Sequence, residues 1–494
     1  MSRSKLLNTL NYQAKSAVIF FSSSVAVPAP PSPLEKANSS INYPQGVDTF
    51  GMQNLKKGLK FSEKYGIIYM LNYHLGVLMK DIGKIIKERQ NELFLTLSEL
   101  VKIDSQSTGA KGNEKEISFY IADKLRELGY EPDVYCPLDI EGFTSHPDFF
   151  SEHDLRERYN VSAVIAGKDH TKRIMLAAHN DTVSVGDPAL WEKDPFSGDI
   201  QDGKIWGRGA CDDKYGIAAM LFLVKIFKEE GLEFPCDIVL TAYCNEEYGG
   251  SHGALAACFR YPCDEIINLD CKDFEIWNSA VGGEEMKVHI RADRSLDDCG
   301  AMLEGLAVLK DEFSKFRDRR IQELREHDEY KNTYVPDDSV RFLEMRAGNA
   351  GTVLDRAHVE ICYYASSSKE EIDAELALMA EDIEKRLAPM GLHFDRYEKT
   401  TRFFHFGKTE AGASIVADLK EAAKRATGRE LKACGSCQSD LSIFLKYGSP
   451  RAVSFGVGRS FAVSGGAHQV DEYIECDRFL ELALILGELF AKSE

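Results

Sequence analysis

The chain has 494 residues, 44% of them hydrophobic, and a formal net charge of −19. This length allows two or three domains with a sizeable core. The negative charge argues against nucleic acid or an anionic membrane surface as a partner, because both are negatively charged themselves. No run reaches the eighteen or so apolar residues of a membrane-spanning helix. Size and composition therefore agree with a large soluble enzyme.

The N-terminal residues 1–52 have a composition of their own. Residues 1–34 contain basic and serine residues but no acidic residue, which is typical of a transit peptide. An untargeted tail fits the same residues. The twelve cysteines lack the dense spacing of a secreted disulfide scaffold, which favours a reducing compartment. We expect a cytoplasmic protein, with organelle targeting by residues 1–34 as the alternative.

Residues 53–84 are predicted to form an added amphipathic helix, and a larger domain is expected to begin at residue 85. Apolar residues recur at three and four positions in KERQNELFLTLSELVKI and in EKEISFYIADKLRELGY, which indicates two helices. Strand and helix patterns then alternate through residue 282. This alternation predicts an α/β domain, with a mostly parallel sheet and helices on both faces.

The pattern changes between residues 283 and 405. Six segments in this range read as strand, helix, strand, strand, helix and strand: EEMKVHIRAD, SLDDCGAMLEGLAVLKDEF, SVRFLEMRA, HVEICYYAS, KEEIDAELALMAEDIEKRL and HFDRYEKT. That order is typical of a ferredoxin-like α+β domain. Because it interrupts the α/β pattern, we predict an inserted domain, after which residues 406–494 complete the α/β domain.

Reactive side chains follow the apolar strands of the α/β domain. IMLAAH ends at His179 with Asp181 two residues later, DIVLTAYCNEE ends in a pair of glutamates, and EIINLD ends at Asp270. Two Gly-rich segments, GRGACD and SGGAHQVDEY, add Asp212 and His468. Since an α/β sheet binds ligands beyond the carboxyl ends of its strands, these groups are predicted to meet in one acidic pocket.

The residue types in this pocket favour divalent metal ions. Carboxylates and imidazoles without thiolates suit a borderline or hard cation such as zinc. Two ions sharing one carboxylate can lower the pKa of a water and polarise a carbonyl, as in two-metal hydrolases. Glu246 and Glu247 would point to opposite sides of a strand, so that one can bind metal while the other serves as general base.

These motifs resemble the dinuclear-zinc peptidase and amidohydrolase family. It contains acetylornithine deacetylase, succinyl-diaminopimelate desuccinylase, aminoacylase, carboxypeptidase G and carnosinase-like dipeptidases. The resemblance runs from about residue 90 to the C-terminus. It includes W-x-x-D-P-F at Trp191 to Phe196 and G-R-G-A-x-D at Gly207 to Asp212. It implies a metallohydrolase in which the inserted domain is a lid that commonly forms a homodimer.

The resemblance also implies a role for each residue of the pocket. Two divalent ions are expected, most simply Zn²⁺, with Co²⁺ or Mn²⁺ as alternatives. The implied assignment is His179 and Asp270 on one ion, Glu247 and His468 on the other, Asp212 as the bridge, Asp181 as the group that orients His179, and Glu246 as the proton shuttle.

The lid departs from the family pattern. RADRSLDDCG has no histidine where the family usually has one, and YYASSS has no arginine. Thr352 and Asp355 occupy positions where Asn and Pro are expected. The substrate-binding residues are therefore not predicted, and an arginine such as Arg341 or Arg346 is the first replacement to test. None of these departures affects the expected metal ligands.

Three functions remain open at the level of sequence. The first is hydrolysis of an amide bond in a small N-acylated amino acid or related amide. The second is a carnosinase-like dipeptidase, which the D-D-K at Asp212 to Lys214 resembles. The third is a non-catalytic binding protein that retains the fold. A substrate panel separates the first two, and metal content separates both from the third.

Overall fold

The structure is a computed structural model that describes residues 81–293, 300–348 and 354–491. The expected targeting segment and most of the expected added helix lie outside these residues. Helix α3 (Ile82–Glu88) crosses the boundary expected after residue 84. Its buried Ile82 and Ile86 pack on α12 (Cys476–Phe490), where Gly487 leaves room for them. Residues 82–84 therefore share the helical layer of the α/β domain.

The large sheet has nine strands in the order β1-β2-β6-β3-β7-β15-β8-β13, with β14 also paired to β8. Its centre, β6-β3-β7-β15, is parallel, whereas the flanking pairs β1/β2, β2/β6, β15/β8 and β8/β13 are antiparallel. The strands are β1 Asp133–Tyr135, β2 Asn160–Ile165, β3 Asp169–His179, β6 Cys236–Tyr243, β7 Glu265–Asn268, β8 Ile276–Ala280, β13 Gly407–Lys408, β14 Ala433–Ser436 and β15 Ala452–Phe455. The predicted α/β class is confirmed, with a sheet that is mixed at its edges.

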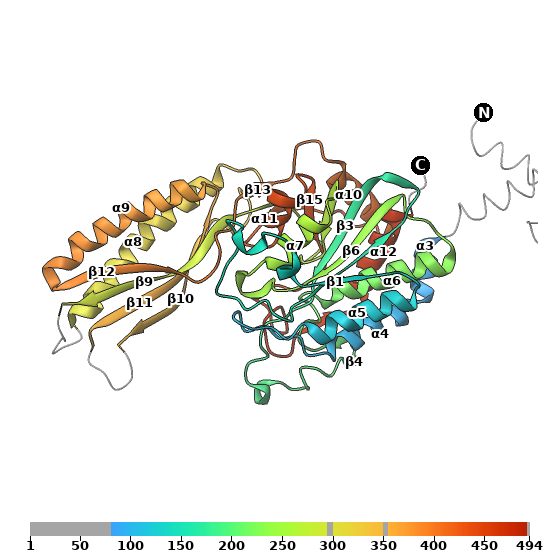
Figure 1. Cartoon of the computed structure of the whole chain (residues 1–494), viewed down its shortest axis with the longest axis horizontal. Helices are drawn as coiled ribbons and strands as arrows, with labels where there is room; N and C mark the ends of the chain where they lie inside the picture. The colour runs from blue at the N-terminus through green and yellow to red at the C-terminus, as the bar shows by residue number, and fades with distance from the viewer. Residues whose placement is uncertain (1–80, 294–299, 349–353, 492–494) are drawn as a thin grey trace, which may run out of the picture. The chain divides into compact units, whose positions relative to one another are not determined.

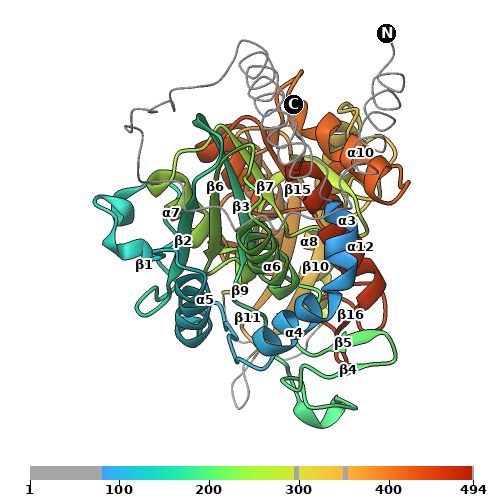
Figure 2. The same ribbon diagram turned by 90° about the vertical axis from the view of Figure 1, so that its right-hand side faces the viewer.

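Helices cover both faces of this sheet because its central strands are apolar on both sides. In β3, Leu176 and Ala178 pack into the cluster that contains α6, whereas Met175 and Ala177 pack with α7. Figure 2 shows α6 close to α4 and α12, which it contacts. The helices are α4 Gln90–Val101, α5 Lys115–Glu127, α6 Lys214–Glu230, α7 His252–Arg260, α10 Ser414–Ala426 and α11 Leu441–Ile443.

A small sheet joins two loops that are distant in sequence. Its three strands run in the order β16-β5-β4, with β4 at Ile200–Gln201, β5 at Lys204–Trp206 and β16 at Tyr473–Glu475. Tyr473 pairs with Trp206, and their rings lie 4.8 Å apart. β5 precedes Asp212 in the chain and β16 follows His468. Their pairing therefore brings together the loops that carry these two residues.

The inserted domain has the predicted order of elements. Its antiparallel sheet, β10-β11-β9-β12, carries α8 and α9, and its buried residues form a core of their own (Figure 1). The elements are β9 Gly282–Ala292, α8 Gly300–Arg325, β10 Val340–Ala347, β11 Arg356–Ala365, α9 Lys369–Leu387 and β12 Leu392–Lys399. Helix α8 continues well past the expected end at residue 313. The ferredoxin-like lid is thus confirmed.

Strand β10 is one of the two outer strands of the lid sheet and is largely exposed. Leu343 and Met345 are 47% and 67% exposed, although both are large apolar side chains. An outer strand also presents unpaired backbone groups along one side. In the described part of the chain, no helix combines the length and apolar character needed to cross a membrane.

Candidate active site

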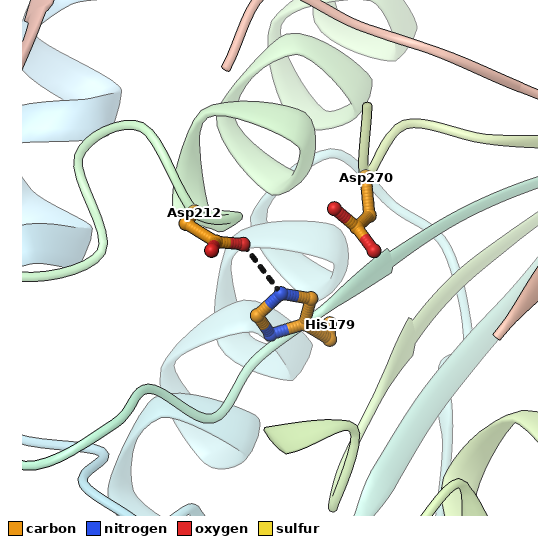
Figure 3. Close-up of side chains that lie close together, drawn as sticks. All are labelled: His179, Asp212 and Asp270. Atoms are coloured by element: carbon orange, nitrogen blue, oxygen red, sulfur yellow. Dashed lines mark hydrogen bonds and ion pairs between the residues drawn. The ribbon is translucent and has the colours of Figure 1, made fainter. Parts of the chain in front are cut away.

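The central strands deliver the predicted site residues to one edge of the sheet. β3 ends at His179, and Asp270 follows β7 after one intervening residue. These strands are parallel neighbours, so their carboxyl ends coincide. Asp212 reaches the same place from the loop before α6. Figure 3 shows the three side chains facing one another.

Two groups of potential ligands share Asp212. Its Oδ1 lies 3.1 Å from His179 Nε2, and its Oδ2 lies 3.4 Å from His468 Nε2. One group is His179, Asp212 and Asp270, and the other is Asp212, Glu247 and His468. Within each group the potential ligand atoms lie within 4.8 Å of one another. His468 is also 3.0 Å from Glu247 Oε2. The structure thus brings all five predicted ligands together, with one oxygen of Asp212 on each side.

A buried ion pair holds the loop that carries Asp212. Arg208 Nη1 donates to Glu472 Oε2 at 2.6 Å, and Glu472 Oε1 accepts the backbone N–H of Cys211 at 2.9 Å. Both charged side chains are almost inaccessible. Since Glu472 lies between His468 and β16, this contact also fixes the second loop of the site. Asp212 is therefore placed by contacts outside the ligand groups.

The site concentrates negative charge in a buried position. Burial raises the pKa of Asp270 to about 7 and raises that of Glu246 well above its usual range. Burial lowers the pKa of His468, but Glu247 and Asp212 outweigh it and bring this pKa to about 9. Glu247 Oε1 is buried without a hydrogen-bond partner among the described residues. These carboxylate and imidazole donors, together with the orphaned oxygen, fit divalent cations.

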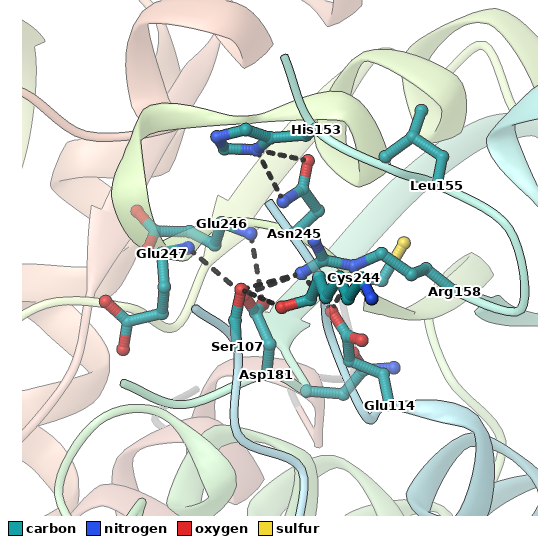
Figure 4. Close-up of polar contacts among 12 residues, drawn as sticks. Ser107, Glu114, His153, Leu155, Arg158, Asp181, Cys244, Asn245, Glu246 and Glu247 are labelled. Carbon is teal, nitrogen blue, oxygen red and sulfur yellow. Dashed lines mark hydrogen bonds and ion pairs between the residues drawn. The ribbon is translucent and has the colours of Figure 1, made fainter. Parts of the chain in front are cut away.

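Asp181 acts differently from the expectation. His179 Nδ1 bonds to the backbone carbonyl of Asp181 at 2.9 Å, while the nearest carboxylate oxygen is 3.8 Å away. The carboxylate instead accepts the backbone N–H groups of Glu246 at 3.0 Å and Glu247 at 3.2 Å (Figure 4). The backbone of Asp181 thus orients the imidazole, and its side chain fixes the two glutamates.

The glutamate pair lies on a tight turn and not on a strand. β6 ends at Tyr243, and positive φ angles occur at Asn245 (59°) and Tyr248 (63°) on either side of the pair. The alternation expected of neighbouring strand residues therefore does not apply. Glu246 and Glu247 both place an oxygen near His179, and Glu247 also faces His468.

Three charged residues at the site were not predicted from sequence. Arg158 and Glu114 are fully buried beside Asp181. Asp440, also fully buried, accepts a short hydrogen bond from Ser251 Oγ, and burial raises its pKa to about 7. The only sequence signal was a charged residue close to a short strand: Asp440 follows β14, and Arg158 precedes β2.

The histidines expected to be packing or surface residues lie outside the ligand groups. His252 is fully buried, where it accepts a hydrogen bond from the backbone N–H of Phe150. His289 and His358 contact each other on the lid sheet, with ring centroids 5.1 Å apart. His405 lies 3.1 Å from Asp148. None of the four belongs to a candidate metal group among the described residues.

The lid positions that depart from the family pattern are only partly described. Thr352 and residues 294–299 lie outside the described residues, and Asp355 pairs with the neighbouring Arg356. Arg341 Nη2 donates to the hydroxyl of Tyr364 at 2.6 Å, and Arg346 is exposed on β10. Arg341 is thus already bonded within the chain.

Comparisons with known proteins identify the family of the chain. The model of peptidase family M20/M25/M40 matches residues 175–492. An uncharacterized metallohydrolase of Methanocaldococcus jannaschii is 26% identical over 424 residues, which cover 79% of this chain and 97% of that protein. Succinyl-diaminopimelate desuccinylase of Cereibacter sphaeroides is 45% identical over 139 residues, covering 27% of this chain and 36% of the enzyme.

The fold is also found in solved structures. Human carnosine dipeptidase 1 matches with a TM-score of 0.59 and 17% identity, over 83% of this chain and 98% of that one. The chain belongs to peptidase family M20/M25/M40, as its motifs predicted. It is accordingly a metallohydrolase of amide or peptide bonds, and the non-catalytic alternative is set aside.

The two ligand groups predict two divalent ions per chain. Elemental analysis of protein saturated with zinc and freed of excess metal should give two ions. Asp212→Ala should reduce occupancy more than any other ligand change, because both groups lose a ligand and the remaining buried charges are left uncompensated. Asp133→Ala, which removes a carboxylate paired with Arg260, is the control and should retain two ions. One ion or none in the unaltered chain would refute the two-ion site.

The glutamate pair predicts two separable defects. Glu246→Gln should retain both ions and the fold while lowering kcat by roughly 10² to 10⁴, the usual contribution of a positioned acid or base. Glu247→Gln should instead lower metal occupancy, because a ligand oxygen is replaced. Steady-state kinetics and elemental analysis of both variants decide the assignment. Equal metal loss in the two variants would contradict it.

Proposed function

We propose that the chain hydrolyses the amide bond of a small N-acylated amino acid or a related amide, using two divalent ions. One observation carries the proposal: Asp212 stands between two groups that each supply one imidazole and one further carboxylate. When bound, two such ions would supply the Lewis acidity that polarises a carbonyl and lowers the pKa of a water. Zn²⁺ is the ion that this donor set suits best, with Co²⁺ and Mn²⁺ as alternatives.

The protein's own residues would supply positioning and proton transfer. Glu246 is the proposed base that takes the proton of the attacking water and passes it to the leaving amine. Burial raises the pKa of its carboxyl, which favours a group able both to accept and to return a proton. His179, Asp270, Glu247, His468 and Asp212 would hold the ions, and the Asp181 carboxylate would keep Glu246 and Glu247 in place.

Two substrate classes fit this chemistry. The similarity to a succinyl-diaminopimelate desuccinylase supports an N-acyl amino acid, although it covers only 27% of this chain. A dipeptide is the alternative, favoured by the D-D-K sequence at Asp212 to Lys214. Asp213 is fully buried there, and neither of its carboxylate oxygens has a hydrogen-bond partner among the described residues. We propose the acyl amino acid first and the dipeptide second.

The exposed edge of the lid supports a homodimer. Strand β10 combines free backbone groups with apolar side chains, and pairing with the same strand of a second copy would bury both. Such a dimer would be isologous, since each copy offers the same surface. We therefore propose assembly through β10, in agreement with the lid's expected role.

A substrate panel tests the proposed function. N-acetyl, N-succinyl and N-formyl amino acids should be hydrolysed by the zinc-loaded chain with a higher kcat/KM than unblocked dipeptides. Release of the free amine measures the rate, and Glu246→Gln is the control for contaminating hydrolases. A clear preference for dipeptides would select the alternative substrate class. No hydrolysis of any amide in the panel would refute the proposal.

The same panel tests carboxylate recognition. A charged hydrogen bond to a carboxylate contributes roughly 1.5 to 3 kcal/mol, and the lid lacks the usual arginine. We therefore expect an acyl amino acid and its amide to differ in kcat/KM by less than about tenfold, or about 1.4 kcal/mol. A preference for the free acid above about a hundredfold, or about 2.7 kcal/mol, would require a further cationic group. Arg346 is the first residue to replace in that case.

The dimer is tested at the lid edge. Sedimentation velocity of the unaltered chain should show a dimer. Leu343→Lys with Met345→Lys should weaken it by about tenfold or more in Kd, or about 1.4 kcal/mol, because lysines at a sheet edge oppose pairing. Leu190→Lys, at a similarly exposed leucine of the α/β domain, should leave the dimer intact. A monomeric unaltered chain would refute the assembly.

A further inference from the structure

We propose that Arg158 is a positioning residue for Glu246 and Glu247, which it holds in place through its contacts with Asp181 and Asn245. The inference rests on the proposed function, because it concerns the two glutamates to which that function assigns proton transfer and metal binding. Arg158 lies just before β2, is fully buried, and belongs to no metal-ligand group in the described chain. Figure 4 shows its side chain beside Asp181 and Asn245, on the side opposite the carboxylate of Glu247.

The first contact runs through Asp181. Arg158 Nη2 lies 3.5 Å from Asp181 Oδ2, and this same oxygen accepts the backbone N–H of Glu247 at 3.2 Å. The other carboxylate oxygen accepts the N–H of Glu246 at 3.0 Å. A carboxylate that accepts two consecutive N–H groups fixes the orientation of that peptide segment. Arg158 in turn limits how the carboxylate can rotate.

The second contact is made to Asn245, the residue before the pair. With its amide oxygen toward Arg158, Asn245 accepts from Nη1 at 2.8 Å and from Nη2 at 3.1 Å. In this orientation the amide oxygen also accepts from His153 Nδ1 at 3.0 Å. Asn245 has a φ of 59°, a left-handed conformation that asparagine adopts more readily than most residues. One guanidinium therefore contacts both the residue before the turn and the carboxylate that binds its backbone.

Glu114 balances the charge of the buried Arg158 guanidinium. Its Oε1 accepts from Arg158 Nε at 2.6 Å and is also bonded to Nη2, and neither side chain is exposed. A buried charge without such a partner would be strongly destabilising. Arg158 Nη2 also donates to Ser107 Oγ at 3.1 Å. The donors thus diverge to several acceptors, a geometry that the planar fork of arginine provides and the single ammonium group of lysine does not.

A positioning role for Arg158 predicts a different result from a purely stabilising role. If the ion pair with Glu114 only supported the fold, its loss would lower the melting temperature and leave ion affinity unchanged. If Arg158 positions the turn, its loss must displace Glu247 relative to His468 and Glu246 relative to the reacting atoms. Outer contacts of this kind typically alter metal affinity or activity by about 10- to 100-fold.

The test uses the full chain with Arg158→Met and Arg158→Lys. Zinc binding is titrated against a chromophoric chelator, kcat and KM are measured on the best substrate of the panel, and thermal unfolding is followed without metal. We expect the affinity for one of the two ions to fall about 10- to 100-fold in both variants, with a lower kcat and little change in KM. Arg158→Lys keeps the buried charge and carries the test alone if Arg158→Met is not soluble.

Arg320→Met is the matched control. Arg320 is a buried lid arginine with 5% of its surface exposed, and it is paired with Glu323 and Glu375 at 2.8 Å each. Its loss should lower thermal stability without weakening either ion. The double variant Arg158→Met/Asp181→Asn should be no worse than the poorer single variant, because both changes break one network.

The outcomes separate this inference from the proposed function. Ion affinity and kcat within about threefold of the unaltered chain, or a purely thermal defect like that of Arg320→Met, would overturn the role of Arg158. Additive effects of the two changes would do the same. Failure of the proposed function appears in the unaltered chain itself, as absent hydrolysis. The affinity comparison needs no substrate and stands in either case.

Discussion

Repulsion between buried carboxylates is the constraint around which this structure is organised. Asp212, Glu247 and Asp270 converge beyond the strand ends, close to the imidazoles of His179 and His468. The shared position of Asp212 follows from this excess of negative charge, because one carboxylate placed between two cations is stabilised by both. The surrounding ion pairs, such as Arg208 with Glu472, hold the loops against that repulsion.

The same constraint explains how the outer residues are arranged. Asp181 directs its carboxylate toward two backbone N–H groups, which donate hydrogen bonds to its charge. Arg158 then balances it on the far side, where Glu114 is the second carboxylate paired with the same guanidinium. The site thus has two parts. The carboxylates of the ligand groups concentrate negative charge, whereas the residues around Asp181 pair their charges with hydrogen-bond donors.

Sequence patterns predicted the parts of the structure that depend on local order. The apolar strands ending at His179 and before Asp270 followed from burial on both faces, and the lid elements followed from their periodicity. The antiparallel edges of the large sheet were missed, because strand pairing is not encoded in the alternation of single strands. The contacts of Arg158 were also missed. Its partners Glu114 and Asp181 lie 44 and 23 residues away, and a side-chain network has no period to detect.

Glu246 and Glu247 differ in position for another reason than the one expected from the sequence. A strand would have separated the two side chains by alternation, but β6 ends at Tyr243, and a turn with left-handed residues follows. Hydrogen bonds from the backbone N–H groups of Glu246 and Glu247 to the Asp181 carboxylate fix the positions of the two residues. The residues could be chosen from sequence, whereas the geometry that distinguishes them could be seen only in three dimensions.

The pairing of β16 with β5 joins two loops of the site that are synthesised far apart in time. Arg208 and Glu472 are 264 residues apart, with the whole lid encoded between them. His179, Asp212 and Asp270 all precede the lid, whereas His468 follows it. During translation, the group of His179, Asp212 and Asp270 is therefore synthesised early. The group that contains His468 is complete only after the lid has been synthesised. The lid begins and ends side by side, with Gly283 and Phe404 exchanging backbone hydrogen bonds at 3.0 and 2.7 Å. An insertion closed in this way can fold without separating the two halves of the site that it interrupts.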